Sequence, residues 1–362
     1  MKKNVLKRVI ASVCVVATVV GGVLVYKESA SGASKIKYTE DIKVVPTMSD
    51  EIGPNSVWCG TFQLVWNEMK HNYAKRDIVF EEMFPMVENL NKEEFTKEML
   101  SDEYYYINYG VPTIELKSEI ENAIKEKFGQ NSDVLDQVDW DGDKDKFLAY
   151  SMLYREFEFE HKFDVLENDK FGDSSKDVRY FGIGNDTKDK VGNQVDVLYY
   201  NNEDDFAIVI YTKSGDELVF CKNPEGKTYN EIYNNMKAKA SSYEGNSSFA
   251  EKDVLKVPYI DFAKMVKYTE LQNKPFMINN PDYDYNVAEI SMAIQTIMFK
   301  LDEKGGRIKS EALMLTKDAC CIIEEEKPRQ FYIDDNFVLF LREEGKEMPY
   351  FAMNVEDIEE FQ

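Results

Sequence analysis

The sequences VAEISMAIQTIMFKLDEKGGRIKSEA, residues 287–312, and FYIDDNFVLFLREEGKEMPYFAMNV, residues 331–355, decide the fold of this chain. Both contain apolar runs typical of strands, and the second has two such runs around a polar Glu-Gly-Lys turn, which predicts a hairpin. A long acidic connection separates the two stretches. In a compact domain an ordered connection longer than about 15 residues is uncommon and usually functional. We therefore predict an exposed functional loop between two strands.

The residues at both ends of this connection resemble those that flank the reactive loop of the serpin family. Phe299–Gly305, with the sequence FKLDEKG, is similar to the family's strand-to-hinge run, which ends in Glu-x-Gly. Phe331 and Phe337 are similar to the two phenylalanines that follow the family's loop. Asp335 and Asn336 stand where the family has Arg-Pro. The hairpin that follows resembles the family's closing hairpin.

Further upstream, residues 147–164, with the sequence FLAYSMLYREFEFEHKFD, resemble the central strand of a serpin and the sharp bend after it. These resemblances cover most of residues 147–362, whereas the earlier part of the chain matches less well. They imply an α+β, serpin-like fold with a large, mostly antiparallel sheet, packed helices and a long exposed reactive loop. Only residues 134–145 stand where typical members carry a long helix across the sheet, so we expect that helix to be short or missing.

The resemblance also implies a mechanism, in which a protease cuts the loop and the freed segment inserts into the main sheet as an additional strand. The hinge of that loop comprises Glu303, Gly305, Gly306, Ile308, Ser310 and Ala312. Every second residue from Gly306 onward is uncharged, as an inserted strand requires, because a buried unpaired charge is strongly unfavourable. Inhibitory members have Thr or Ser and then Ala here, so the β-branched Ile308 predicts slow insertion. The alternative is a fixed or solvent-exposed strand that does not insert.

Two further sets of site residues follow from the resemblance. Counting along the family's loop places the scissile bond within Ala319, Cys320, Cys321, Ile322, Ile323, Glu324 and Glu325, a window without Lys or Arg. A trypsin-like target, whose specificity pocket has an Asp at its base, is therefore disfavoured. Ser151 and Gln295 stand where the family has an Asn and a His that hydrogen-bond at the point where the sheet opens, and we expect them to form the corresponding pair.

The N-terminal region predicts an exported protein. Basic residues precede an uncharged apolar run, Val9–Tyr26, that is longer than a usual signal-peptide core and near the lower limit for a membrane span. We interpret residues 1–27 as an uncleaved signal anchor, residues 28–42 as a flexible tether and residues 43–362 as the serpin-like domain. The alternative is a cleaved secretion signal. The expected location is the extracellular face of the cell membrane, or the medium if the signal is cleaved.

The acidity of the chain restricts its partners. The chain has 67 acidic and 44 basic residues, a net charge of −23, and every acidic residue follows position 27. Such a surface repels nucleic acid and anionic lipid. We expect a monomer whose partner is a target protease of the serine or cysteine class, or another neutral or basic protein, with membrane contact through the N-terminal segment alone. The acidity is equally consistent with a role in solubility only.

The sequence predicts no catalytic site, metal site or cofactor. The two histidines, His71 and His161, have no nearby Ser or Cys in a nucleophile motif, so we do not expect an enzyme. The acidic run Asp139–Asp145 lacks the glycine and glutamate positions of an EF-hand loop and predicts a solvated turn. Cys59 and Cys221 lie in apolar runs and predict buried thiols. The expected function is protease inhibition, and the alternative is a non-inhibitory serpin-fold protein that binds a partner at the cell surface or acts as a scaffold.

Hydrophobic periodicity predicts the remaining elements. Helical spacing predicts helices over Val57–Lys70, Ile114–Phe128 and Asn230–Ala240. Apolar runs between turn residues predict strands over Phe147–Phe159, Gln194–Tyr200, Phe206–Thr212, Glu217–Cys221, Val257–Phe262 and Val287–Leu301. Separate helices and antiparallel strands without a βαβ alternation indicate the α+β class.

Overall fold

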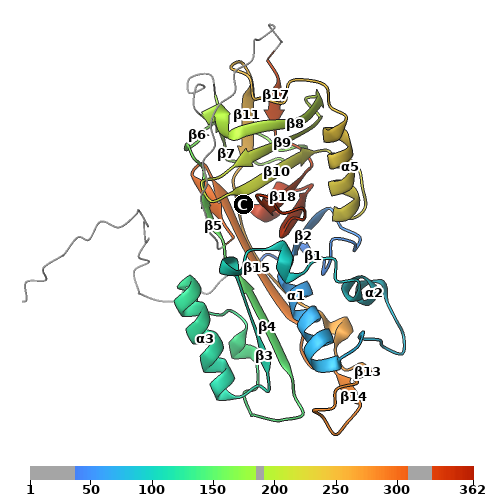
Figure 1. Cartoon of the computed structure of the whole chain (residues 1–362). Coiled ribbons are helices and arrows are strands. Elements are labelled where there is room, and N and C mark those ends of the chain that lie inside the picture. Colours follow the sequence, from blue (N-terminus) through green and yellow to red (C-terminus); the bar gives the residue numbers. More distant parts are fainter. Residues whose placement is uncertain (1–36, 185–190, 309–327) are drawn as a thin grey trace, which may run out of the picture. The chain divides into compact units, whose positions relative to one another are not determined.

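A computed structural model describes residues 37–184, 191–308 and 328–362 (Figure 1). Lys37–Gln362 forms one unit by its internal contacts. The predicted anchor, residues 1–27, and most of the predicted tether therefore lie outside the described residues. Within the described residues, no helix is both long and apolar enough to cross a membrane.

The largest sheet has seven strands among the described residues, in the order β1-β2-β19-β18-β10-β9-β8 (Figure 1). Its strands are β1 (Lys43–Val44), β2 (Asn55–Cys59), β19 (Phe351–Val355), β18 (Phe337–Glu343), β10 (Asp216–Lys222), β9 (Asp205–Tyr211) and β8 (Val195–Asn202). The β1–β2 pair is parallel and the other pairs are antiparallel. β10 and β19 are buried along their whole length, because both faces of this part of the sheet are covered.

A second sheet contains the start of the predicted hinge. In the order of the sheet, its strands are β12 (Ile260–Lys267), β15 (Ile294–Asp302), β16 (Gly305–Arg307) and β5 (Glu156–Glu158). All three pairs are antiparallel. A separate antiparallel ladder is formed by β3 (Tyr105–Gly110) and β4 (Leu148–Leu153), and the chain passes from β4 directly into β5.

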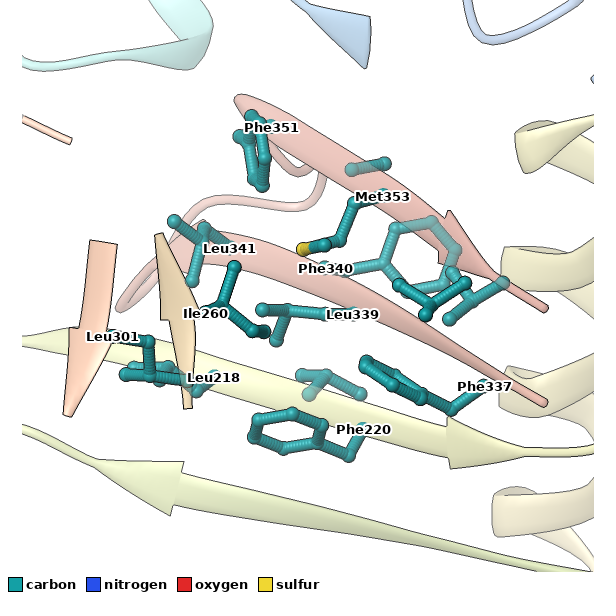
Figure 2. Close-up of a cluster of buried hydrophobic side chains, with 14 of the residues drawn as sticks. Leu218, Phe220, Ile260, Leu301, Phe337, Leu339, Phe340, Leu341, Phe351 and Met353 are labelled. Carbon is teal, nitrogen blue, oxygen red and sulfur yellow. The ribbon is translucent and has the colours of Figure 1, made fainter. Parts of the chain in front are cut away.

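The first and second sheets share one hydrophobic core. Figure 2 shows Leu218 of β10 and Leu341 of β18 beside Ile260 of β12 and Leu301 of β15. All four side chains are at most 1% exposed. Burying a leucine or isoleucine side chain fully contributes about 1.5–3 kcal/mol, so this contact holds the hinge-bearing strand β15 against the largest sheet.

Two smaller sheets complete the strands of the described residues. One has the order β17-β11-β7-β6, with β17 (Gln330–Tyr332), β11 (Val254–Pro258), β7 (Tyr180–Ile183) and β6 (Asp164–Val165). The other is the antiparallel pair β13 (Pro275–Met277) and β14 (Val287–Glu289). β17 is the first strand after residues 309–327, so the predicted loop joins β16 of the second sheet to a different sheet.

The helices of the described residues lie mainly in the first two-thirds of the chain. They are α1 (Thr61–Glu68), α2 (Pro85–Asn91), α3 (Ile114–Phe128) and α5 (Tyr229–Ser241), with a π-helical turn η1 (Met69–Ala74) directly after α1. Short 3-10 turns are η2 (Lys97–Met99), η3 (Asp102–Tyr104), η4 (Leu135–Gln137), η5 (Gly192–Gln194), η6 (Thr269–Leu271) and η7 (Ile358–Phe361).

α3 covers one face of the β3–β4 ladder. Its residues Ile120 and Ile124 are buried in a cluster that includes Tyr150 of β4 and, partly buried, Tyr106 of β3. Thr113 caps the first turn by accepting a hydrogen bond from the backbone N–H of Leu116 at 3.1 Å. Residues 134–145, where the sequence predicts a short or missing helix across the sheet, contain only the 3-10 turn η4.

The predicted α+β class is confirmed, because helices and mostly antiparallel strands occupy separate parts of the chain. The predicted hairpin within residues 331–355 is the antiparallel pair β18–β19. The helices predicted over residues 114–128 and 230–240 are α3 and α5, and the three strands predicted between residues 194 and 221 are β8, β9 and β10. Cys59 and Cys221 are buried free thiols, as predicted.

One helix and one strand were predicted with wrong bounds. The helix predicted over Val57–Lys70 begins only at Thr61, because Val57 and Cys59 belong to β2 and pair with β19. The strand predicted over Val257–Phe262 is divided between β11 and β12, which belong to different sheets, and the chain changes sheet at Tyr259.

Two other predicted strands are interrupted. The strand predicted over Phe147–Phe159 is divided into β4 and β5 at Tyr154 and Arg155, where the arginine side chain is fully buried. The strand predicted over Val287–Leu301 is divided into β14 and β15, because the backbone carbonyls of Ile290 and Ala293 accept hydrogen bonds from another segment, residues 268–273.

Candidate functional site

The predicted hinge begins as a strand that is already part of the second sheet. Gly306 of β16 lies opposite Leu301 of β15 on one side and opposite Phe157 of β5 on the other. Glu303 and Lys304 form the turn between β15 and β16. Gly305 and Gly306 therefore lie between β15 and β5. β5 is the end of the strand that the sequence predicts at the centre of the sheet.

Only glycine fits the first two positions of β16. Gly305 has a φ of +149°, and a Cβ atom there would lie 2.1 Å from the carbonyl oxygen of Phe157. A Cβ atom on Gly306 would lie 2.6 Å from the carbonyl oxygen of Lys300 and 2.6 Å from the Phe157 ring. β15 and β5 thus pack closely against β16 from both sides, and glycine permits that approach.

Replacing Gly306 with valine is expected to destabilise the protein by about 1–3 kcal/mol, because the new side chain must displace β16 or the Phe157 ring. The matched control is Arg307→Val at the next position, where the side chain is exposed and valine suits a strand. Urea denaturation of the two variants checks the expectation. Equal losses of stability would contradict the close packing around Gly306.

The turn before β16 is fixed by Tyr259 and by the segment that follows β5. Tyr259 Oη donates a hydrogen bond to a Glu303 carboxylate oxygen at 2.7 Å, and Lys162 Nζ lies 3.3 Å from the other oxygen. The backbone N–H groups of Phe159 and Phe163 donate to the carbonyls of Lys304 and Glu303, each at 2.9 Å. Burial acts to raise the pKa of Glu303, but the hydrogen bonds and the Lys162 charge outweigh it and lower the pKa below its ordinary value.

The last two described residues of the hinge segment differ in burial. Ile308 is buried at 7% exposure in the main core, whereas Arg307 is exposed and lies 3.9 Å from Glu156 of β5. Ser310 and Ala312, and the whole predicted scissile window from Ala319 to Glu325, lie outside the described residues. Their predicted roles stay predictions.

Ser151 and Gln295 meet at the first residue of α1. Ser151 Oγ donates a hydrogen bond to the Thr61 carbonyl at 2.8 Å. Gln295 Nε2 donates to Thr61 Oγ1 at 3.0 Å and to the Cys59 carbonyl at 3.1 Å, and its Oε1 accepts from Tyr268 Oη at 2.8 Å. The structure therefore joins the predicted pair through Thr61 instead of directly.

This junction spans two strands that do not pair with each other. Among the described strands, β4 pairs with β3 alone, and β15 pairs with β12 and, at one end, with β16. Thr61 holds Ser151 of β4 and Gln295 of β15 from the start of α1, and Gln295 is only 5% exposed. Beyond β16, β15 therefore has no paired strand on this side among the described residues. Side-chain hydrogen bonds through Thr61 connect it to β4 instead.

A buried arginine fixes the junction between β4 and β5. The Arg155 side chain is fully buried, and its Nε lies 2.6 Å from Asp216 Oδ1 of β10, which is also fully buried. Its guanidinium lies 4.0 Å from the Tyr104 ring centre and 5.0 Å from that of Tyr350. None of its nitrogens makes a well-directed hydrogen bond in the described residues, so charge and ring contacts hold the cation.

Sequence reasoning missed Thr61, Phe157 and Arg155. A Gly-Thr pair before an apolar helical run can mark the start of a helix, so the position of Thr61 at the beginning of α1 had a local signal. Its contacts with Ser151 and Gln295 had none, because they join residues far apart in the chain. The same holds for the Phe157 ring over Gly306.

No family model matches the sequence. No curated protein matches it either. Among solved structures, the chain is similar to Serpin48, described as a highly specific serpin of the insect Tenebrio molitor, with 14% identity and a TM-score of 0.44 over 84% of this chain and 92% of the other.

Two further solved structures are similar to the chain. Thyroxine-binding globulin in complex with thyroxine has 13% identity and a TM-score of 0.39, over 67% of this chain and 64% of the other. Human glycosylated kallistatin has 13% identity and a TM-score of 0.41, over 68% of this chain and 64% of the other. The chain therefore spans less than two-thirds of the length of these two proteins.

Proposed function

We propose that this chain is an exported, serpin-like protease inhibitor that acts through cleavage of the segment after β16 and insertion of the freed segment beside β15. The observation that carries the proposal is the position of β16, which already pairs antiparallel with both β15 and β5. Insertion would extend an existing strand, because the first hinge residues are already paired.

The register of β16 defines what an extended strand would contact. Arg307 lies opposite Lys300, so continuing the same antiparallel register would set residues 308–313 opposite Phe299–Ile294. Ile308, Ser310 and Ala312 would then face the buried positions Phe299, Ile297 and Gln295. These three residues are uncharged, whereas Arg307, Lys309 and Glu311 would take the other face. The charge alternation of the sequence and the register of the sheet therefore agree.

Insertion would also have to break the junction at which Thr61 is hydrogen-bonded to both Ser151 and Gln295. Ala312 would lie opposite Gln295, whose amide is hydrogen-bonded to Thr61 and Cys59. A strand between β4 and β15 would move Ser151 away from Gln295, and Thr61 cannot then hold both. We propose that this junction keeps the sheet closed until the loop is cut.

The target we propose is a protease of the serine or cysteine class. A net charge of −23 favours a basic protease by electrostatic attraction, and the absence of Lys and Arg from the predicted scissile window disfavours a trypsin-like enzyme. The chain itself would catalyse no reaction, bind no nucleic acid and need no cofactor. It would act as a monomer at the extracellular face of the membrane, or in the medium if residues 1–27 are removed.

The second candidate function is non-inhibitory binding or scaffolding at the cell surface. The observation that favours it is the close packing of Gly305 and Gly306 between β15 and β5, together with the buried, β-branched Ile308. Such packing would slow extension of the strand, and a slow insertion releases the protease before it is trapped.

Incubation of the protein with a panel of serine and cysteine proteases, followed by a denaturing gel, separates the two functions. An inhibitor is expected to give an adduct that survives SDS, and mass spectrometry is expected to find the cut within residues 319–325. Ala312→Glu, which would put a charge opposite Gln295, is expected to turn the protein into a substrate that is cut without an adduct. Glu311→Gln, on the other predicted face, is the matched control and should keep the adduct. Cleavage without an adduct for every protease and variant would leave the non-inhibitory function.

A further inference from the structure

The β13–β14 pair has one buried and one exposed face. Phe276 of β13 and Phe80, which is bridged to it, are 2% and 3% exposed and pack in a second hydrophobic cluster. Because side chains alternate along a strand, the neighbours of these residues point the other way. The hairpin is therefore anchored by its inner face, and its outer face is free to present other side chains.

Three apolar side chains form a row on that outer face. Met277 lies directly opposite Val287 of β14, and the antiparallel bridge between Phe80 and Phe276 sets Val79 beside Met277. Their exposed fractions are 45% for Val79, 43% for Met277 and 48% for Val287. We name these three residues the outer row. Single exposed apolar residues are ordinary, but three in register across neighbouring strands make a continuous apolar strip.

The strand β14 also has an open edge. β14 pairs with β13 alone among the described strands. The N–H of Ile278 donates to the carbonyl of Asn286, and the N–H of Asn273 donates to that of Ile290. Since backbone groups alternate in direction along an antiparallel strand, those of Val287 and Glu289 point away from β13. Both residues are exposed, so their N–H and C=O groups are available to another strand.

Acidic side chains lie on β14 and in the connection before it. Glu289 lies on β14 itself, and Asp282 and Asp284 lie in the connection from β13 to β14. Glu81 follows the bridged Phe80 along the chain and therefore lies across β13 from this edge. All four are exposed. A strand that reaches the open edge thus meets Val287 at the end of the outer row, with Glu289 on the same strand and two carboxylates in the adjoining connection.

We propose that the open edge of β14 is a docking site for an extended segment of a partner protein in which apolar and basic residues alternate. The segment would pair with the backbone of Val287 and Glu289 as an added strand. Its apolar side chains would pack beside Val287 at the end of the outer row, and its lysines or arginines would lie near Glu289 and the carboxylates of the β13–β14 connection. This surface is separate from the β16 hinge and does not depend on the proposed inhibitory function.

The charge of the edge argues against two other occupants. A second copy of the chain would bring the same three carboxylates, Glu289, Asp282 and Asp284, to the interface, and like charges that face each other oppose pairing. An anionic lipid surface would be repelled for the same reason. A basic segment is the partner class that satisfies both the open backbone groups and the acidic border.

The proposal is tested with a labelled peptide of sequence Lys-Val-Lys-Val-Lys-Val and the full-length protein, by fluorescence anisotropy at low salt. Saturable binding is expected, with the affinity reduced at least about tenfold at high salt because charge attraction is screened. Two control peptides test whether binding needs positive charge and backbone hydrogen bonds. Glu-Val-Glu-Val-Glu-Val should not bind, and a Lys-Val peptide with N-methylated backbone amides should bind at least about tenfold more weakly.

Two proline variants locate the binding edge. Val287→Pro removes an N–H that points away from β13, so the hairpin should keep its fold and lose at least about tenfold in affinity. The matched control is Val165→Pro on β6, another exposed residue on a strand at a sheet edge, which should bind as the parent does. Unchanged melting temperatures establish that both variants are folded.

Several results would overturn the proposal. Binding of the N-methylated peptide as tightly as its parent would exclude strand addition, and equal losses for the two proline variants would exclude β14 as the site. Absence of saturable Lys-Val binding would exclude a basic segment. Concentration-dependent dimerisation that Val287→Pro abolishes would assign the edge to a second copy of the chain instead.

Discussion

Cleavage of the chain between Leu313 and Glu326 is expected to raise its melting temperature by about 10 °C or more. Six residues of β15, Ile294–Phe299, lie beyond the last residue that pairs with β16. If an inserted segment adds a hydrogen bond for each of them at about 1 kcal/mol, the cut protein gains about 6 kcal/mol. For a chain longer than 250 residues, 1 kcal/mol corresponds to about 2 °C, so the expected rise follows.

Thermal unfolding followed by circular dichroism, before and after complete cleavage, measures this effect. The Ala312→Glu variant provides the control, since a charge opposite Gln295 should suppress the rise while leaving the cut itself possible. Ile308→Ala is expected to speed the change after cleavage, because a smaller side chain repacks more easily. A melting temperature that does not change on cleavage would favour the non-inhibitory function.

The sequence was sufficient to predict elements whose local pattern and tertiary role agree. α3 has a capping threonine, helical spacing and a glycine at its end, and its bounds are those predicted. β18 and β19 are apolar runs around a polar turn, and they pair as the predicted hairpin. In each case the pattern that identifies the element also determines which residues are buried.

The prediction failed where tertiary contacts override a local pattern. Val57 and Cys59 have helical spacing with the residues after them, yet they are part of β2 because β19 offers them a strand partner. The run from Val257 to Phe262 is apolar throughout, and nothing in it marks Tyr259 as the point where the chain changes sheet. The Tyr259 side chain donates a hydrogen bond to Glu303, which is too far along the chain for a local sequence pattern to indicate the contact.

The candidate site also has features that the sequence could predict and features that depend on tertiary contacts. The alternation of charged and uncharged residues predicts which face of the hinge is buried after insertion, and in the uncut chain Ile308 is buried and Arg307 is exposed. It could not predict that Gly305 and Gly306 are packed between two strands, because that depends on the Phe157 carbonyl and ring. Nor could it predict Thr61 as the common partner of Ser151 and Gln295, since the three residues come together only in the folded chain.

Replacing Arg155 with leucine is expected to destabilise the protein by about 3–5 kcal/mol, because it leaves the buried Asp216 carboxylate without its cation. The matched control is Arg179→Leu. The Arg179 guanidinium also lies over a tyrosine ring, 4.1 Å from the centre of Tyr259, but this arginine is exposed and its loss should cost less than about 1 kcal/mol. Urea denaturation at neutral pH compares the two variants.

The pH dependence of the stability of the Arg155→Leu variant tests whether the loss comes from the unpaired charge of Asp216. Burial raises the pKa of Asp216 above its ordinary value of 3.8, although Arg155 and the hydrogen bonds from Tyr350 and Ser214 oppose that rise. Without Arg155 the pKa rises further. A carboxyl group with a raised pKa in the folded state destabilises that state at high pH, and this cost disappears as pH falls toward 3.8. The gap in stability between parent and variant should therefore narrow on acidification.

The double variant Arg155→Leu/Asp216→Asn separates the lost charge from the lost packing. Asparagine is neutral and can still accept the hydrogen bond that Tyr350 Oη donates at 2.8 Å, so the double variant should recover part of the stability at neutral pH. Since Arg155 directly precedes β5, which pairs with β16, the single variant should also increase amide exchange in residues 156–158 and 305–307. A double variant no more stable than the single one would mean that the arginine does not act through its ion pair with Asp216, which leaves its packing against Tyr104 and Tyr350 and its second carboxylate contact, with Glu343 at 3.5 Å.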